Sequence, residues 1–241
     1  MPETVLEFRS VSRTTSEHLH ALTNASFCLH SGDLIIVKSS VDNEYHHIID
    51  IALGLARPGS GHVLFEGRDW QDMNAFEEAE CRGKMGFVFE TPGWISSLTI
   101  LENIALRIRH HTTRSEDDIR NEIDKLVKLA GIIDAHDIGM RPDLVSRRRR
   151  RIYEWVRACL GPPRVVLMAF PERGAASDTL GGLLRISGHT AAEGAAVMII
   201  SDRIDKLKSL SKSNWEQISA EDLFGKNRGH TTHTESGGKN L

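Results

Sequence analysis

The fold is decided by a short apolar run that follows a glycine turn, Gly32-Asp33-Leu34-Ile35-Ile36-Val37. Consecutive apolar residues without alternation are typical of a strand that is buried on both faces of a parallel sheet. Between residues 44 and 55 the apolar side chains recur at helical spacing. The sequence therefore predicts a strand followed by a helix, which is the repeating unit of an α/β fold.

The same alternation of strands and helices continues along the chain. Further strands are predicted at Val5–Phe8, Ala25–Leu29, His62–Phe65, Met85–Phe89, Val165–Phe170 and Val197–Ser201. The clearest helix spans residues 115–131, where Ser115 can cap the first turn and Gly131 stands at the C′ position. A second helix carries Ile152, Trp155, Val156 and Cys159. This order predicts an open α/β sheet with helices on both faces.

Composition describes a globular chain and excludes several classes of protein. The 241 residues are 40% hydrophobic and 26% charged, which argues against disorder. A net charge of −3 gives no reason to expect a nucleic-acid partner. No apolar run approaches the length of a membrane span, and the first residues do not resemble a secretion signal. The three cysteines are widely separated, which favours a reduced, intracellular compartment and provides no metal-binding pair.

The last residues differ in character from the rest. Residues 225–241 lack the apolar side chains that a folded segment would bury, so we expect a disordered polar tail after a single domain over residues 1–224. Histidines are present in this tail, but their spacing predicts no metal site.

Three runs at fixed distances carry a resemblance to a known family. They are Gly54-Leu55-Ala56-Arg57-Pro58-Gly59-Ser60-Gly61-His62-Val63-Leu64-Phe65-Glu66-Gly67, then Met85-Gly86-Phe87-Val88-Phe89-Glu90, then Ser97-Leu98-Thr99-Ile100-Leu101-Glu102-Asn103-Ile104-Ala105-Leu106. Over residues 4–210 the chain resembles the nucleotide-binding subunit of ABC transporters. The resemblance implies a RecA-like P-loop NTPase core, an antiparallel β subdomain and an inserted α-helical subdomain at about residues 91–160. Within this family, residues 92–103 and 107–111 are most similar to the ATPase subunits of Mla-type (MCE-linked) phospholipid transporters.

The family's phosphate loop is altered here. Its pattern, Gly-x-x-x-x-Gly-Lys-Ser/Thr, falls on Ser39-Ser40-Val41-Asp42-Asn43-Glu44-Tyr45-His46. Ser39 and Glu44 replace the glycines that let the backbone approach phosphate. Tyr45 replaces the lysine, His46 replaces the hydroxyl residue, and Asp42 adds negative charge. Each lost charge-assisted bond is worth about 1.5–3 kcal/mol, so two losses weaken nucleotide binding by about a hundredfold or more.

The other positions that the family uses for hydrolysis are altered as well. Glu90 stands where the resemblance places the Q-loop glutamine. Ala169 and Phe170 replace the Walker B aspartate and glutamate, which hold Mg²⁺ and polarise the attacking water. Ala176 replaces the D-loop aspartate, and Asp202 replaces the switch histidine. We therefore expect a retained fold without ATPase chemistry, and no cofactor or metal bound by this chain.

The signature segment becomes strongly basic. The family's Leu-Ser-Gly-Gly-Gln falls on Val145-Ser146-Arg147-Arg148-Arg149 and opens a run of five arginines that ends at residue 151. Three interpretations stay open: a solvated basic turn, a surface for an acidic partner, or cations that face ATP held by a partner subunit. The resemblance assigns Ser146, Arg147, Arg148 and Arg149 to the partner-subunit interface.

The leading hypothesis is a catalytically inactive ABC ATPase-like subunit of an inner-membrane transporter, with a phospholipid as substrate. The resemblance implies that Glu90, Trp94, Ile95 and Leu98 line a groove for a permease subunit. It also implies pairing with an active ABC ATPase paralogue, or with a second copy, at the cytoplasmic face of the inner membrane, with Mg-ATP held only by the partner. A regulatory or scaffold protein that keeps the fold is the alternative, and an active enzyme with rebuilt ATP chemistry is a third hypothesis.

Overall fold

The structure is a computed structural model that describes residues 2–13, 22–38, 46–91, 93–210 and 216–219. The expected phosphate-loop residues Ser39, Asp42, Glu44 and Tyr45, and the expected tail at residues 225–241, lie outside the described residues. For His46 the structure describes the backbone and not the side chain.

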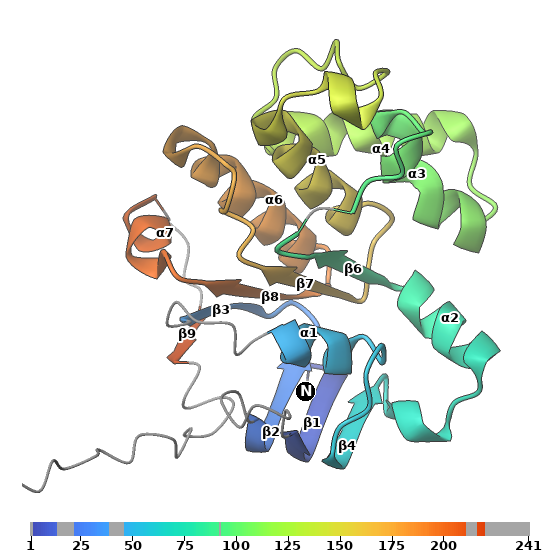
Figure 1. Ribbon diagram of the computed structural model, residues 1–241, viewed down its shortest axis with the longest axis vertical. Coiled ribbons are helices and arrows are strands. Elements are labelled where there is room, and N and C mark those ends of the chain that lie inside the picture. The colour runs from blue at the N-terminus through green and yellow to red at the C-terminus, as the bar shows by residue number, and fades with distance from the viewer. Residues whose placement is uncertain (1, 14–21, 39–45, 92, 211–215, 220–241) are drawn as a thin grey trace, which may run out of the picture.

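A parallel sheet forms the centre of the molecule (Figure 1). It has the strand order β6-β7-β8-β3-β9, and every neighbouring pair is parallel. The strands are β3 (Leu34–Lys38), β6 (Met85–Val88), β7 (Val165–Ala169), β8 (Ala196–Ser201) and β9 (Glu216–Ser219). Every residue of β7 and β8 is buried, which confirms the interpretation of their apolar runs as strands covered on both faces.

A separate antiparallel sheet stands beside the core. Its order is β2-β1-β4-β5, built from β1 (Thr4–Arg13), β2 (Leu22–His30), β4 (Ser60–Phe65) and β5 (Arg68–Asp69). Helix α1 (His46–Ala52) lies between the two sheets, and its isoleucines join a core cluster that contains side chains of both (Figure 1). The antiparallel β subdomain that we expected is therefore present.

Helices cover the other face of the parallel sheet and form a group of their own. The α-helices after α1 are α2 (Ala75–Gly83), α3 (Ile100–His111), α4 (Glu116–Leu129), α5 (Arg147–Cys159), α6 (Leu180–Ala192) and α7 (Ile204–Leu210). Short 3-10 turns are η1 (Trp70–Asp72), η2 (Pro142–Leu144) and η3 (Ser177–Thr179). In Figure 1, α3 and α4 lie beyond β6, with α5 between them and the sheet, as expected for an inserted helical subdomain.

Local signals set the helix boundaries. Ser115 caps α4 by accepting a hydrogen bond from the Asp118 amide, and Gly131 follows the helix with φ +93°. Thr99 and Glu102 form a capping box at the start of α3. None of the helices in residues 2–13, 22–38, 46–91, 93–210 and 216–219 combines the length and hydropathy that crossing a bilayer requires.

Several strand boundaries differ from the predicted ones; for example, β1 continues to Arg13 and β6 ends at Val88. The end of β7 is the difference with a clear physical cause. We expected β7 to extend through Phe170, but the strand ends at Ala169 and Phe170 has φ +46°. This is the left-handed region, which a bulky L-residue enters only where surrounding contacts hold it. The Phe170 amide donates to the Ile200 carbonyl at 2.8 Å, so β8 fixes the turn.

Candidate functional site

The carboxyl ends of β6, β7 and β8 meet at one edge of the sheet, and Arg173 joins them there. One guanidinium nitrogen donates to Asp202 Oδ2 at 2.8 Å, and another donates to the Glu90 carboxylate. The guanidinium carbon lies 3.8 Å from the centre of the Phe170 ring. We call Glu90, Phe170, Arg173 and Asp202 the edge cluster. It brings together three of the positions named from the sequence, around an arginine that the sequence reasoning missed.

The residues that replace the expected Walker B carboxylates are apolar and buried. Ala169 is 2% exposed and Phe170 is 3% exposed. Neither side chain can coordinate a cation or accept a proton from water. The sites where the resemblance places Mg²⁺ ligation and water activation therefore contain no carboxylate in this chain.

A third carboxyl group, Glu172, lies next to the edge cluster. Its Oε1 accepts a hydrogen bond from the Ser201 hydroxyl at 2.7 Å, and the side chain is almost fully buried. Burial raises the pKa of Glu172, and the neighbouring Asp202 raises it further. Glu172 Oε2 and Asp202 Oδ1 are buried without a hydrogen-bond partner among the described residues. With Asp202 beside it, the buried Glu172 carboxyl keeps its proton to a higher pH than an exposed glutamate does.

A small cavity opens at the same edge, between α1 and the ends of β6 and β7. Its volume is about 300 Å³, and its lining residues are Ile49, Asp50, Phe89, Glu90, Thr91 and Ala169. The charged groups in this lining are two carboxylates and no cation. A polyphosphate in this cavity would therefore meet the carboxylate of Asp50, while the charge of Glu90 is balanced by Arg173.

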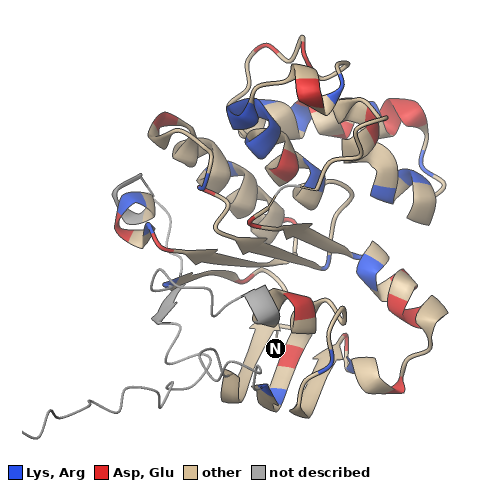
Figure 2. Ribbon diagram, viewed as in Figure 1, with Lys and Arg blue, Asp and Glu red and all other residues tan. Residues whose placement is uncertain are grey.

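The five-arginine run opens α5, where Figure 2 shows basic residues gathered. Ser146 is the N-cap, and its hydroxyl accepts from the Arg149 amide at 3.4 Å. Arg147 and Arg148 are exposed, and Arg148 bridges both carboxylate oxygens of Asp178 at 2.8 Å. This end of the run is a solvated basic surface, of the kind that the first of the three interpretations describes.

The run turns inward at Arg149. Its guanidinium donates to Asp137 Oδ1 at 2.7 Å, and the Tyr153 hydroxyl donates to the same oxygen at 2.6 Å. Burial raises the pKa of Tyr153, and the Asp137 hydrogen bond adds to the effect. Arg149 thus fixes the loop before α5 to the helix.

Arg151 is a core residue with 2% exposure. It donates to the carbonyls of Phe89 and Phe170, each at 2.7 Å, and to Glu154 Oε2 at 2.6 Å. It also donates to the Pro171 carbonyl at 3.1 Å. The arginine run is therefore two structures: an exposed start, and an interior end that satisfies backbone groups next to the edge cluster.

A groove opens between β6, α3 and α5. Its volume is about 620 Å³, and the lining combines apolar with cationic side chains. The lining residues are Arg82, Met85, Gly86, Phe87, Phe89, Gly93, Ile95, Asn103, Leu106, Arg107, His110, His111, Arg157 and Ala158. None of these described lining residues is a carboxylate, and we call the opening the basic groove. Burial lowers the pKa of Arg107 to about 10, which still leaves it cationic at neutral pH.

The four residues expected to line a permease groove occupy different places. Ile95 lines the basic groove and is 46% exposed. Trp94 packs against the core beneath Arg157, whose guanidinium carbon lies 4.8 Å from the ring centre. Leu98 is half-buried, and Glu90 belongs to the edge cluster. Sequence reasoning missed Leu106, which spacing along α3 places on the same face as His110.

We call the described residues 90–91 and 93–98 the groove loop, and two residues of the helical subdomain hold its second part. Asn103 is buried; its Oδ1 accepts from the Ile95 amide at 2.9 Å, and its Nδ2 donates to the Ile95 carbonyl at 3.0 Å. Arg157 donates to the Gly93 carbonyl at 2.6 Å. The groove loop thus connects the edge cluster, through Glu90, to the wall of the basic groove.

Comparisons with known proteins were made for sequence and for structure. No family model matches the chain. It is 28% identical over 149 residues to the methionine import ATP-binding protein MetN of Photobacterium profundum, covering 62% of this chain and 42% of that protein. It is 29% identical over 122 residues to the probable ribonucleotide transport ATP-binding protein mkl of Mycobacterium leprae, covering 51% and 35%. The aligned regions thus span less than half the length of these curated relatives.

Solved structures share the architecture at low sequence identity. A dimeric bacterial ABC transporter cassette has a TM-score of 0.75 and 20% identity, covering 84% of this chain and 90% of that chain. A nucleotide-free ATP-binding cassette from an ABC transporter has a TM-score of 0.66 and 18% identity, covering 92% and 88%.

Proposed function

We propose that the chain, which has the ABC ATPase fold and resembles ATP-binding proteins of transport systems, is a catalytically inactive subunit of an ABC transporter complex. In this role it docks a membrane permease and pairs with a subunit that supplies the ATP chemistry. The relatives named above are ATP-binding proteins of transport systems, which supports the transporter context.

One observation carries the proposed inactivity. At the carboxyl edge of β7, Ala169 and Phe170 are buried and apolar where an ATPase of this fold needs carboxylates. The neighbouring carboxylates Glu90 and Asp202 are engaged by Arg173. Arg173 thus holds two of the carboxylates at this edge, and neither of them stands at the β7 positions where the fold places its metal ligand and general base.

The basic groove supports the docking role. An apolar lining with cationic side chains and no carboxylate suits an amphipathic helix that carries acidic residues. Leu106 and Ile95 are 44% and 46% exposed there, so a partner would remove apolar surface from water. We propose that a cytoplasmic helix of the permease occupies this groove.

The pairing and the substrate follow from the resemblance in sequence. A homodimer of this chain would have no competent ATP site, so we propose a heterodimer with an active paralogue that holds Mg-ATP. The similarity of residues 92–103 and 107–111 to Mla-type ATPases supports a phospholipid as the transported substrate. This assembly would place the chain at the cytoplasmic face of the inner membrane.

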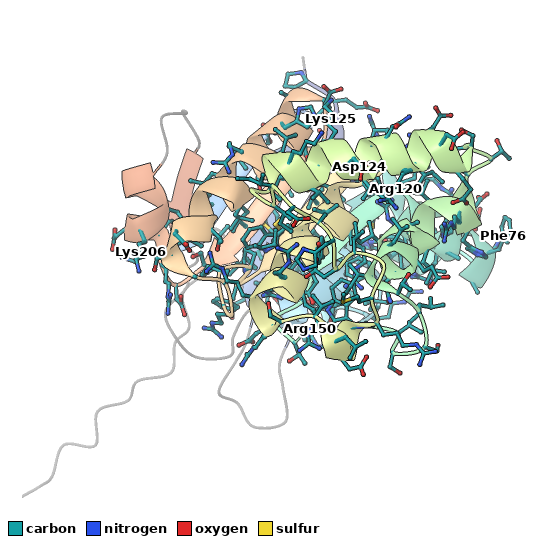
Figure 3. The ribbon with its side chains drawn as sticks, turned by 90° about the horizontal axis from the view of Figure 1, so that it is seen from above. Phe76, Arg120, Asp124, Lys125, Arg150 and Lys206 are labelled. Carbon is teal, nitrogen blue, oxygen red and sulfur yellow. The ribbon has the colours of Figure 1, made fainter. Side chains whose placement is uncertain are left out.

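Site-specific photo-crosslinking in membranes of the native host tests the docking role. A benzoylphenylalanine in place of Ile95 is expected to crosslink to an integral membrane protein with several spans. The matched control is the same replacement at Phe76, which is 72% exposed on α2 and lies at the periphery of the molecule (Figure 3). Crosslinks from both positions, or from neither, would contradict docking through the basic groove.

Two other outcomes would replace the proposal. A crosslink from Ile95 to a protein without membrane spans would favour the alternative, a regulatory or scaffold protein that keeps the ABC ATPase fold. Steady turnover of Mg-ATP by the purified chain alone would establish an active enzyme with rebuilt chemistry.

A further inference from the structure

Arg173 contacts side chains that are far apart in the sequence. Its two carboxylate partners are 83 residues before it and 29 residues after it. Glu90 follows β6, Asp202 follows β8, and Arg173 itself lies in the turn after β7. One side chain therefore links the loops that leave three adjacent parallel strands.

The chemistry of arginine suits this linkage. A guanidinium is planar and presents its donors in a rigid fork, so it can serve two carboxylates at once, whereas an ammonium is a point charge. The Phe170 ring lies against the guanidinium and orders its plane. Arg173 is only 28% exposed, so solvent weakens these ion pairs less than it would on an open surface.

The position of the linkage is the reason to give it a function. In open α/β sheets, ligands bind in the crevice outside the carboxyl ends of the strands, and bound ligands order the loops there. Here the chain supplies its own cation at that edge. The backbone at Phe170 is held at φ +46°, a conformation that its surroundings must maintain.

We propose that Arg173 is a positioning residue: an internal ionic crosslink that holds the three edge loops in one arrangement without a bound nucleotide and so presets the basic groove for its partner. The chain itself links Arg173's partner Glu90 to the basic groove, because Glu90 is the first residue of the groove loop. Arg157 and Asn103 bind that loop farther along, at Gly93 and Ile95. The part of this proposal that concerns the groove rests on the proposed docking function, while the crosslink itself does not.

Hydrogen exchange measured by mass spectrometry on the purified full chain tests the crosslink. In Arg173→Met, we expect amide exchange to rise about tenfold at residues 89–91 and 200–203 as well as at 170–174, which corresponds to about 1.4 kcal/mol of lost protection. Arg173→Lys keeps the charge without the fork and is expected to give an intermediate rise. The matched control, Arg148→Met, removes an exposed ion pair with Asp178 and is expected to affect only residues near that pair.

A purely local structural role predicts a different pattern. If Arg173→Met raised exchange at 170–174 alone and left 89–91 and 200–203 as in the wild type, the crosslink would be refuted. Should that variant fail to fold, Glu90→Gln and Asp202→Asn each remove one arm and keep Arg173. Each is then expected to raise exchange in the opposite arm as well, and an effect confined to its own loop would overturn the proposal.

The groove part has its own readout. Photo-crosslinking from Ile95 is expected to fall severalfold in the Arg173→Met and Glu90→Gln backgrounds. An unchanged yield would show that the groove is not preset by the crosslink. The wild type with benzoylphenylalanine at Ile95 could give no photo-crosslink while hydrogen exchange in the Arg173 variants follows the prediction. The proposed docking function would then fail, and the ionic crosslink through Arg173 would stand.

Discussion

Replacing Arg151 with methionine separates the interior end of the arginine run from its exposed start. Arg151 is 2% exposed and donates to Glu154, which is 1% exposed, and to the carbonyls of Phe89 and Phe170. Removing one member of a buried ion pair leaves the other uncompensated and costs about 3–5 kcal/mol. For a domain of this size that corresponds to a loss of roughly 10 °C in melting temperature.

Urea denaturation followed by circular dichroism and tryptophan fluorescence measures this loss. Arg148→Met is the matched control, because its ion pair with Asp178 is solvent-exposed, and we expect a change of no more than about 0.5 kcal/mol. Arg151→Met combined with Glu154→Met is expected to recover much of the loss, since a buried ion pair replaced by apolar residues is often neutral. Equal destabilisation by Arg151→Met and Arg148→Met would refute the assignment of Arg151 to the core.

Three further substitutions have defined outcomes. Gly86→Ala places a Cβ 1.8 Å from the Ala158 carbonyl oxygen, so it is expected to lower the unfolding free energy by about 1–3 kcal/mol in chemical denaturation. The control Gly188→Ala meets open space within α6 and should be neutral or stabilising. Equal effects of the two substitutions would contradict the packing of β6 on α5. The pKa of Glu172 is raised, so the stability that its neutral form contributes is complete below the ordinary value of 4.5 and is lost as pH rises through the raised value. The unfolding free energy of Glu172→Gln minus that of the wild type should therefore grow as pH rises above 4.5, and a difference that stays constant with pH would refute the shift. Asn103→Ala removes the buried anchor of the groove loop and should raise hydrogen exchange at residues 93–98 more than at the far end of α3; unchanged exchange there would count against the anchor.

Periodicity and capping were sufficient to predict the main elements. Continuous apolar runs located β3, β7 and β8 because these strands are buried on both faces. The Ser115 cap and the C′ position of Gly131 delimited α4, since both act over a single turn of chain. The ABC ATPase fold was implied by the resemblance that three runs carry, and the solved structures confirm it.

The edge cluster could not be predicted in the same way. Arg173 gains its role from partners 83 and 29 residues away, which no local pattern records. The end of the β7 strand was misplaced because Phe170 is apolar like the residues before it, while its turn is imposed by β8.

Arg151 did leave a signal in the sequence. It precedes Trp155 and Cys159 at intervals of four, so it shares their buried helical face. The charge of the run concealed this spacing. The basic groove left a weaker signal in the sequence, because β6, α3 and α5 each contribute only part of its wall.

We propose that the chain keeps the ABC ATPase scaffold without the groups that bind a nucleotide. Isothermal titration calorimetry of the purified full chain with Mg-ATP tests it most directly. We expect no saturable binding at micromolar to low-millimolar nucleotide. Stoichiometric binding with a micromolar Kd that is abolished when EDTA removes the Mg²⁺ would contradict it.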